Sequence, residues 1–156
     1  MAGRGIRGAE LALWAIWLGA LWFMAILVAP GLFKWLPRPE AGLVAGRLFY
    51  MLTWFSVFVS VVLLVLPNVF SQMRASTKLN ALMVLIVAVC VVELAWLHPV
   101  MDGMRQAMAT AEGQELSALR SKFGNMHAVS SVLYSVKMIG ALVWGLGRYG
   151  VKAAAQ

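Results

Sequence analysis

The sequence predicts an all-α membrane protein, in which an antiparallel four-transmembrane-helix bundle carries short amphipathic interfacial helices. Hydrophobic residues make up 62% of the chain and charged residues only 12%, whereas a soluble domain carries roughly 25% charged residues. The mean hydropathy is +0.83, and four long apolar runs each approach the roughly 20 residues that cross a bilayer. These observations exclude a soluble globular protein and predict a single membrane domain over residues 1–156.

The apolar runs and their flanking residues define the helices. We expect them at about residues 9–33, 39–71, 79–98 and 115–148. The third should stop before Pro99, because proline cannot continue the hydrogen-bond ladder of a helix. The short link at 72–78 predicts that the second and third helices are antiparallel neighbours. Between residues 100 and 122, apolar residues recur at helical spacing, which predicts two amphipathic pieces with a break near Gly113.

The charge distribution bears on partners and orientation. The net charge is +7, but the basic residues lie mainly between apolar runs, where lipid headgroups account for them better than nucleic acid. One side of the membrane collects Arg4, Arg7, Arg74, Lys78, Arg148 and Lys152, and the other collects Lys34, Arg38, Arg47, Arg105, Arg120 and Lys122. The counts tie. Because Glu10, in the first turn of the first helix, is the one acid near the first set, we expect both termini in the cytoplasm of a bacterial inner membrane. The expected partners are membrane lipids and a second copy of the chain, with any other protein partner left open.

Most polar residues within the apolar segments gather on the fourth helix. His127, Ser131 and Tyr134 fall on one helical face, since offsets of four and seven return to nearly the same angle, and Ser130 flanks that face. A polar stripe with a histidine near its mouth is suited to a substrate or proton path. The alternative is helix packing, with the serines bonded to their own backbone.

Glu93 and Lys137 are the charges that lie deepest in the apolar runs. At about 1.5 Å per residue, their expected depths differ by several ångströms, which a lysine side chain closes only in part. Two alternatives therefore stay open. Either the two side chains form an ion pair, or Glu93 is protonated or bonded internally while Lys137 extends toward the interface.

Antiparallel packing places the end of the third helix and the start of the fourth at one membrane face, so His98 and His127 should lie at similar depth, with Met126 nearby. Imidazole suits copper, zinc or haem iron, and thioether sulfur favours copper(I). His127, His98 and Met126 are therefore candidate ligands for a metal or haem. The alternative is an interfacial histidine and methionines that fill gaps between apolar side chains.

Some classes of chemistry lack their motifs in this chain. There is no glycine-rich phosphate-binding loop, no HExxH, no CxxC and no pair of carboxylates in the apolar segments. We therefore expect no ordinary hydrolase or nucleotide-driven activity. The absence of these motifs favours a protein that is not an enzyme.

Three stretches carry a resemblance to a known family: LFKWLPRPEAGLVAGRLF at 32–49, WLHP at 96–99 and FGNMHAVSS at 123–131. They resemble the transmembrane-protein-205-like family, which implies a four-span bundle and places Arg38 and His127 on family motifs. The animal member is linked to resistance to platinum drugs. The family is distantly similar to copper-resistance D-type membrane proteins and to haem-associated membrane oxidases. His98 departs from the acid or amide expected beside that proline, which weighs against a shared two-histidine metal site.

The leading functional hypothesis is an inner-membrane protein that handles or exports a small soft solute, such as a metal ion or a metal complex. Its polar pocket would consist of Arg38, Glu93, His127, Ser130, Ser131 and Tyr134. One alternative is a haem- or copper-binding membrane redox protein. Another is an assembly subunit without chemistry of its own, which the small size and the small-xxx-small pair Gly42 and Gly46 favour.

Overall fold

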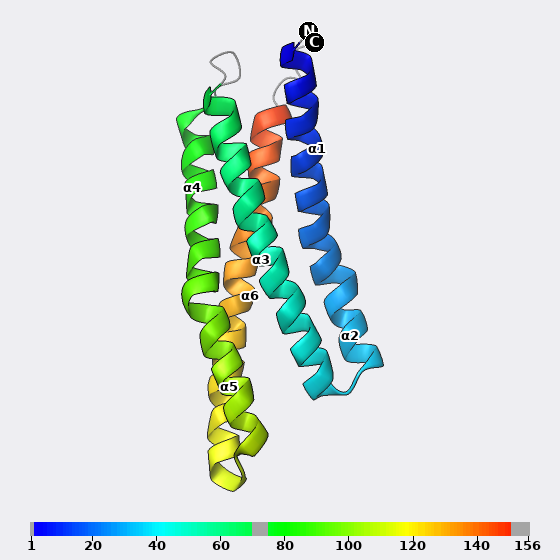
Figure 1. The fold of residues 1–156 in the computed structure, drawn as a ribbon, viewed down its shortest axis with the longest axis vertical. Helices are drawn as coiled ribbons and strands as arrows, with labels where there is room; N and C mark the ends of the chain where they lie inside the picture. Colours follow the sequence, from blue (N-terminus) through cyan, green and yellow to red (C-terminus); the bar gives the residue numbers. More distant parts are fainter. Residues whose placement is uncertain (1, 70–74, 151–156) are drawn as a thin grey trace.

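The protein is a bundle of four long helical spans that run antiparallel (Figure 1). The computed structural model describes residues 2–69 and 75–150, and no strand occurs among them. The elements are α1 (Ala2–Phe23), η1 (Met24–Val28) and α2 (Ala29–Trp35) in the first span, α3 (Arg38–Val69) in the second, α4 (Thr77–Val92), η3 (Glu93–Leu97) and α5 (His98–Thr110) in the third, and α6 (Gly113–Tyr149) in the fourth. The predicted fold class is confirmed.

The first and third spans each contain one π-helical turn, η1 and η3, and each turn is followed by a proline, Pro30 or Pro99. A proline lacks the backbone N–H and clashes with the carbonyl four residues before it, so a wider turn relieves both problems. The amide of His98 accordingly donates to the carbonyl of Glu93, five residues earlier. The expected helix end at His98 is therefore wrong, because the span continues through Pro99 to Thr110.

One further boundary differs from expectation, one lies outside the described residues, and one agrees. The first helix begins at Ala2 rather than about residue 9, and the expected end of the second helix at 71 lies outside the described residues. The break near Gly113 is confirmed, since 111–112 leave the helix and Gly113 has φ +57°, a conformation that glycine adopts without strain. The amphipathic segments on either side of it belong to α5 and to the first part of α6. Together they form a hairpin that projects beyond the α2–α3 turn (Figure 1).

The four spans form a closed ring, because α1 packs on α3, α3 on α4, α4 on α6 and α6 on α1. The predicted neighbours α3 and α4 are thus confirmed. The core includes Trp17, Leu63, Ile86 and Trp144, which are fully or almost fully buried. Many large apolar side chains point outward instead, Ile16 and Phe58 among them. Such an apolar surface is suited to contact with lipid.

One glycine allows α1 and α6 to approach closely. A Cβ atom at Gly145 would lie 1.9 Å from the Trp14 ring, so no larger residue fits without displacing the indole. The Trp14 ring also donates a hydrogen bond of 2.8 Å from Nε1 to the carbonyl of Ala141. The two helices are therefore fastened at the end where α1 begins and α6 ends, which we call the terminal end. The opposite end, where α5 turns into α6, is the hairpin end (Figure 1).

Only some of the basic residues used to predict the orientation lie among the described residues. Arg7 lies at the terminal end on α1, and Lys34 and Arg38 flank the α2–α3 turn at the hairpin end (Figure 1). Arg74 and Lys152 lie outside the described residues, as does the side chain of Arg4. The common end of the termini follows from four antiparallel spans, and the side of the membrane on which it lies stays a prediction.

Candidate functional site

An ion pair between Glu93 and Lys137 lies inside the bundle. The Lys137 Nζ atom is 2.6 Å from Glu93 Oε2, and the two residues are 0% and 3% exposed. Glu93 is the first residue of η3, and Lys137 lies in α6. Side chains on a helix lean toward its N-terminus, so on two antiparallel helices they lean in opposite directions. Because Gly140 lies opposite Ile86, Lys137 is nearer the terminal end than Glu93, and these two side chains lean toward each other. This lean closes the offset in depth and decides the open alternative in favour of direct pairing.

Thr53 of α3 completes the polar cluster around the ion pair. Its Oγ1 lies 3.3 Å from Glu93 Oε2 and 3.4 Å from Lys137 Nζ. The same hydroxyl lies 2.9 Å from the carbonyl of Phe49. A hydroxyl has one proton, so Thr53 donates either to the carboxylate or to its own helix while it accepts from the ammonium group. The cluster therefore has two hydrogen-bond arrangements that differ by a rotation of one hydroxyl.

His98 connects this cluster to the hairpin end. Its Nε2 is 3.4 Å from Thr53 Oγ1, and its ring meets the edge of Tyr50 at a centroid distance of 5.3 Å. His98 is half-buried and Tyr50 is exposed. We call Glu93, Lys137, Thr53 and His98 the charge network. It passes from the fully buried lysine to a histidine beside an exposed tyrosine.

Tyr134 holds the network against α1. Its hydroxyl donates a hydrogen bond of 2.6 Å to the carbonyl of Leu21, and its ring lies 5.2 Å from Lys137 Nζ. A cation over an aromatic ring is attracted by the ring quadrupole, which further stabilises the charged form of Lys137. Phe49 packs edge-on against Tyr134 with a centroid distance of 5.1 Å. The predicted polar residue Tyr134 thus belongs to the same cluster as Glu93.

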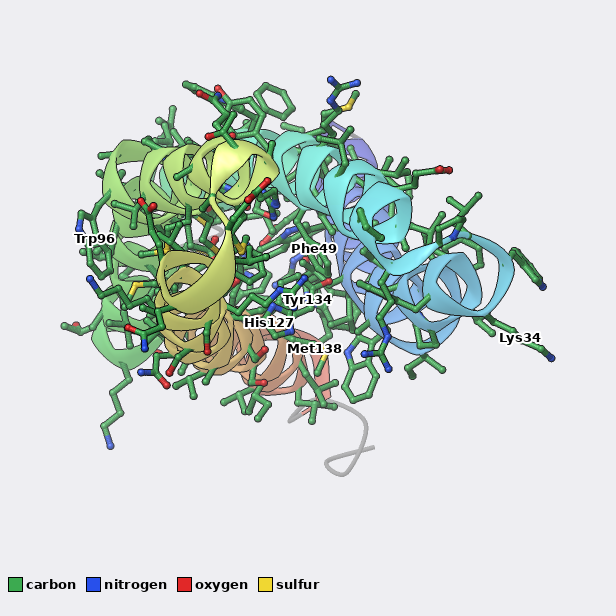
Figure 2. All side chains as sticks on the ribbon, turned by 90° about the horizontal axis from the view of Figure 1, so that it is seen from below. Lys34, Phe49, Trp96, His127, Tyr134 and Met138 are labelled. Carbon is green, nitrogen blue, oxygen red and sulfur yellow. The ribbon has the colours of Figure 1, made fainter. Side chains whose placement is uncertain are left out.

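The other predicted pocket residues lie elsewhere. Figure 2 shows His127, Tyr134 and Met138 along one side of α6, but the side chain of His127 is exposed, as is that of Arg38. Ser131 is also exposed and donates to the carbonyl of His127 at 2.9 Å. Ser130 is half-buried. The structure therefore brings Glu93 and Tyr134 together around Lys137 and leaves the remaining four outside this cluster.

The candidate metal ligands His98, Met126 and His127 stay a prediction. His98 contacts Thr53 and Tyr50, Met126 is half-buried and His127 is exposed. Over 2–69 and 75–150, no group of three histidine, cysteine, aspartate or glutamate side chains is placed to hold a metal ion.

A polar face of α3 escaped the sequence prediction. Thr53, Ser56 and Ser60 are buried, and their offsets of three and seven place them on one side of the helix. Ser56 accepts a hydrogen bond of 3.0 Å from Trp17 Nε1. This spacing of small polar residues within an apolar run was the available signal for an inward face.

A second buried ion pair, between Glu10 and Arg148, was also missed. Arg148 Nε and Nη2 lie 2.8 and 3.2 Å from the two carboxylate oxygens of Glu10, which is 0% exposed. Glu10 was expected to lie in the first turn of its helix. That interpretation is wrong, because α1 begins at Ala2 and Glu10 lies beyond the first turn. The pair joins α1 to α6 at the terminal end.

Four apolar spans around an interior that holds two buried ion pairs define a multi-pass membrane protein with ionisable groups buried among its helices. Comparison with protein families matches residues 12–110 to a domain of unknown function, DUF4149, and the chain belongs to this family. The match contains Thr53, Glu93 and His98 and ends before Lys137. No curated protein and no solved structure matches the chain.

Proposed function

We propose that this protein handles or exports a small solute at the membrane. We also propose that the charge network exchanges a proton during this process. The observation that carries the proposal is the Glu93–Lys137 pair, with both side chains almost completely buried. Replacing a buried ion pair by apolar residues is often neutral or stabilising, so stability alone is a weak reason for its presence. Ionisable residues inside membrane spans commonly mark solute or proton paths.

The contacts support a specific proton step. Transfer of one proton from Lys137 Nζ to Glu93 Oε2, across 2.6 Å, converts the ion pair into a neutral amine and a neutral carboxylic acid. The attraction between η3 and α6 then falls, because a charge-assisted hydrogen bond becomes a neutral one. The Thr53 hydroxyl lies within reach of both groups and of His98, so it is suited to pass a proton toward the hairpin end. The π-turn that begins at Glu93 fits this role, since such turns are frequent at functional sites.

The nature of the solute rests on the family resemblance. Similarity to the transmembrane-protein-205-like family and, more distantly, to copper-resistance D-type proteins supports a metal ion or metal complex. We also propose a bacterial inner membrane as the location, with both termini cytoplasmic. The haem or copper redox hypothesis rests on His127, His98 and Met126 as candidate ligands from the sequence.

A proton-flux measurement tests the proposal. The purified chain is placed in liposomes that contain a pH-sensitive dye, and an ion gradient or an added metal salt drives flux. The variant Glu93→Gln with Lys137→Met removes both charges and should fold, because no charge is left unpaired. We expect it to lose proton movement.

The matched control removes the other buried pair through Glu10→Gln with Arg148→Met. It should keep proton movement, since this pair lies outside the charge network. Unchanged flux in the first double variant would contradict the proposal, as would equal losses in both. Wild-type protein that moves no protons under any gradient would also overturn it.

A further inference from the structure

A groove at the hairpin end lies between α3 and α5, and it adjoins the charge network through Tyr50, whose ring contacts His98. Its volume is about 430 Å³, and Gly46, Arg47, Tyr50, Asp102 and Arg105 are among the residues that line it. Its two arginines against one aspartate make the groove positive by one charge. No step of the proposed proton exchange uses these residues.

Arg105 is held in this groove with part of its hydrogen-bonding capacity unused. Its guanidinium lies over the Phe123 ring, 5.4 Å from the ring centroid, and Nη1 pairs with Asp102. The Nε atom is buried and has no hydrogen-bond partner. A buried N–H without an acceptor is costly. An acceptor that enters the groove and reaches this N–H would therefore relieve an existing cost.

Gly46 makes this position of Arg105 accessible. A Cβ atom at Gly46 would lie 2.7 Å from Arg105 Nη2, so the guanidinium occupies the space that a side chain would fill. A Cβ atom at Gly42, one turn away, would meet nothing within 4 Å. The small-xxx-small pair thus has one member that accommodates the guanidinium and one that does not.

The depth of the groove indicates which acceptor can reach it. The uncharged stretch 48–69 of α3, at about 1.5 Å per residue, is long enough to cross a hydrocarbon core of about 30 Å. Arg47 directly precedes this stretch, and on the third span the groove residue Asp102 follows the apolar run. Both groups therefore lie at the level of the lipid headgroups. An arginine fork matches a phosphate group in shape and charge.

We propose that this groove binds the phosphate of an anionic phospholipid headgroup, with Arg105 and Arg47 as its donors and Gly46 as the residue that positions Arg105. Basic pockets between transmembrane helices bind such headgroups in this way. Asp102 keeps Arg105 oriented while the groove is empty, and its negative charge favours a headgroup that also carries hydroxyl donors. Phosphatidylglycerol meets both requirements.

Lipid binding to the full chain in detergent tests this proposal, with native mass spectrometry counting bound phosphatidylglycerol and phosphatidylcholine. We expect phosphatidylglycerol to bind more tightly. Gly46→Ala should weaken its binding about tenfold, as expected for loss of a charge-assisted hydrogen bond. Gly42→Ala should change it less than about twofold, as is usual for surface substitutions. The fold should survive Gly46→Ala, because the displaced group is the end of a flexible side chain.

A second pair of variants separates this groove from general attraction to a basic protein. Arg105→Lys keeps the charge but loses the planar fork, and Arg120→Lys makes the same exchange at an exposed position on α6. Only Arg105→Lys should weaken binding. Equal effects of the two glycine variants would overturn the proposal, and so would equal binding of the two lipids. Displacement of the lipid by millimolar inorganic phosphate would overturn it in favour of a free phosphate site.

Discussion

The two buried ion pairs differ in the chemistry of their cations. Arg148 meets both carboxylate oxygens of Glu10 with its planar fork, at 2.8 and 3.2 Å. Lys137 meets one oxygen of Glu93, at 2.6 Å, and Thr53 lies beside both groups. Arginine stays charged in proteins, whereas a buried lysine can release its proton. The first pair is therefore suited to fasten α1 to α6, and the second fits the proposed proton exchange.

One face of α6 carries both pairs and the core between them. Lys137, Ala141, Trp144 and Arg148 recur at offsets of four, seven and eleven, which places them in line along the helix. Ala141 and Trp144 are buried in the core, between the two cations. The core thus separates the pair at the terminal end from the charge network, so each can be altered while the other is left intact.

The largest expected effect comes from breaking the charge network on one side. Lys137→Met leaves Glu93 buried and unpaired, which should cost about 3–5 kcal/mol of unfolding free energy. Unfolding in mixed micelles, followed by circular dichroism, measures this loss. Adding Glu93→Gln to the same chain should recover most of it. A double variant as unstable as the single one would mean that the loss comes from packing instead of charge.

A smaller effect should follow from forcing α1 away from α6. Gly145→Ala places a Cβ atom against the Trp14 ring, and overpacking of this kind costs about 1–3 kcal/mol. The same unfolding measurement applies, with Gly19→Ala as the control because its Cβ would meet nothing within 4 Å. Proton movement should persist in folded Gly145→Ala, since the charge network does not depend on this contact.

Changing the shape of the cation at the terminal end should have a still smaller effect. Arg148→Lys keeps the positive charge but loses the two-point contact with Glu10, so we expect a loss of about 1 kcal/mol. Proton flux in liposomes should equal that of the unmodified chain. If flux instead disappears while the protein stays folded, the Glu10–Arg148 pair takes part in proton movement and does more than hold α1 against α6.

A similarly small effect on stability should accompany a selective effect on function in the last variant. Thr53→Val keeps the shape of the side chain and removes its hydroxyl, which should cost roughly 0.5–1.5 kcal/mol. Proton movement should nevertheless fall strongly, because the link between the ion pair and His98 is lost. Thr53→Ser should restore flux. Normal flux in Thr53→Val would remove the hydroxyl from the proposed path.

The candidate site was partly predictable. The burial of Glu93 follows from its place in an apolar run, and Tyr134, which the sequence also singled out, lies in the same cluster. The pairing with Lys137 stayed open because depth estimates along a helix axis omit the direction in which side chains lean. The Glu10–Arg148 pair joins residues that are far apart in the sequence, so no local sequence pattern predicts it.

The sequence by itself determined the four spans, their antiparallel order and the break at Gly113, because hydropathy, helix length and glycine chemistry act locally. The tertiary structure decided which polar groups meet. It carried the third helix through Pro99 by a π-turn, left His127 and Arg38 exposed, and joined Glu93 to Lys137. The physical reason is that a buried charge depends on a partner from another helix, and which side chains face each other is settled only when the helices pack.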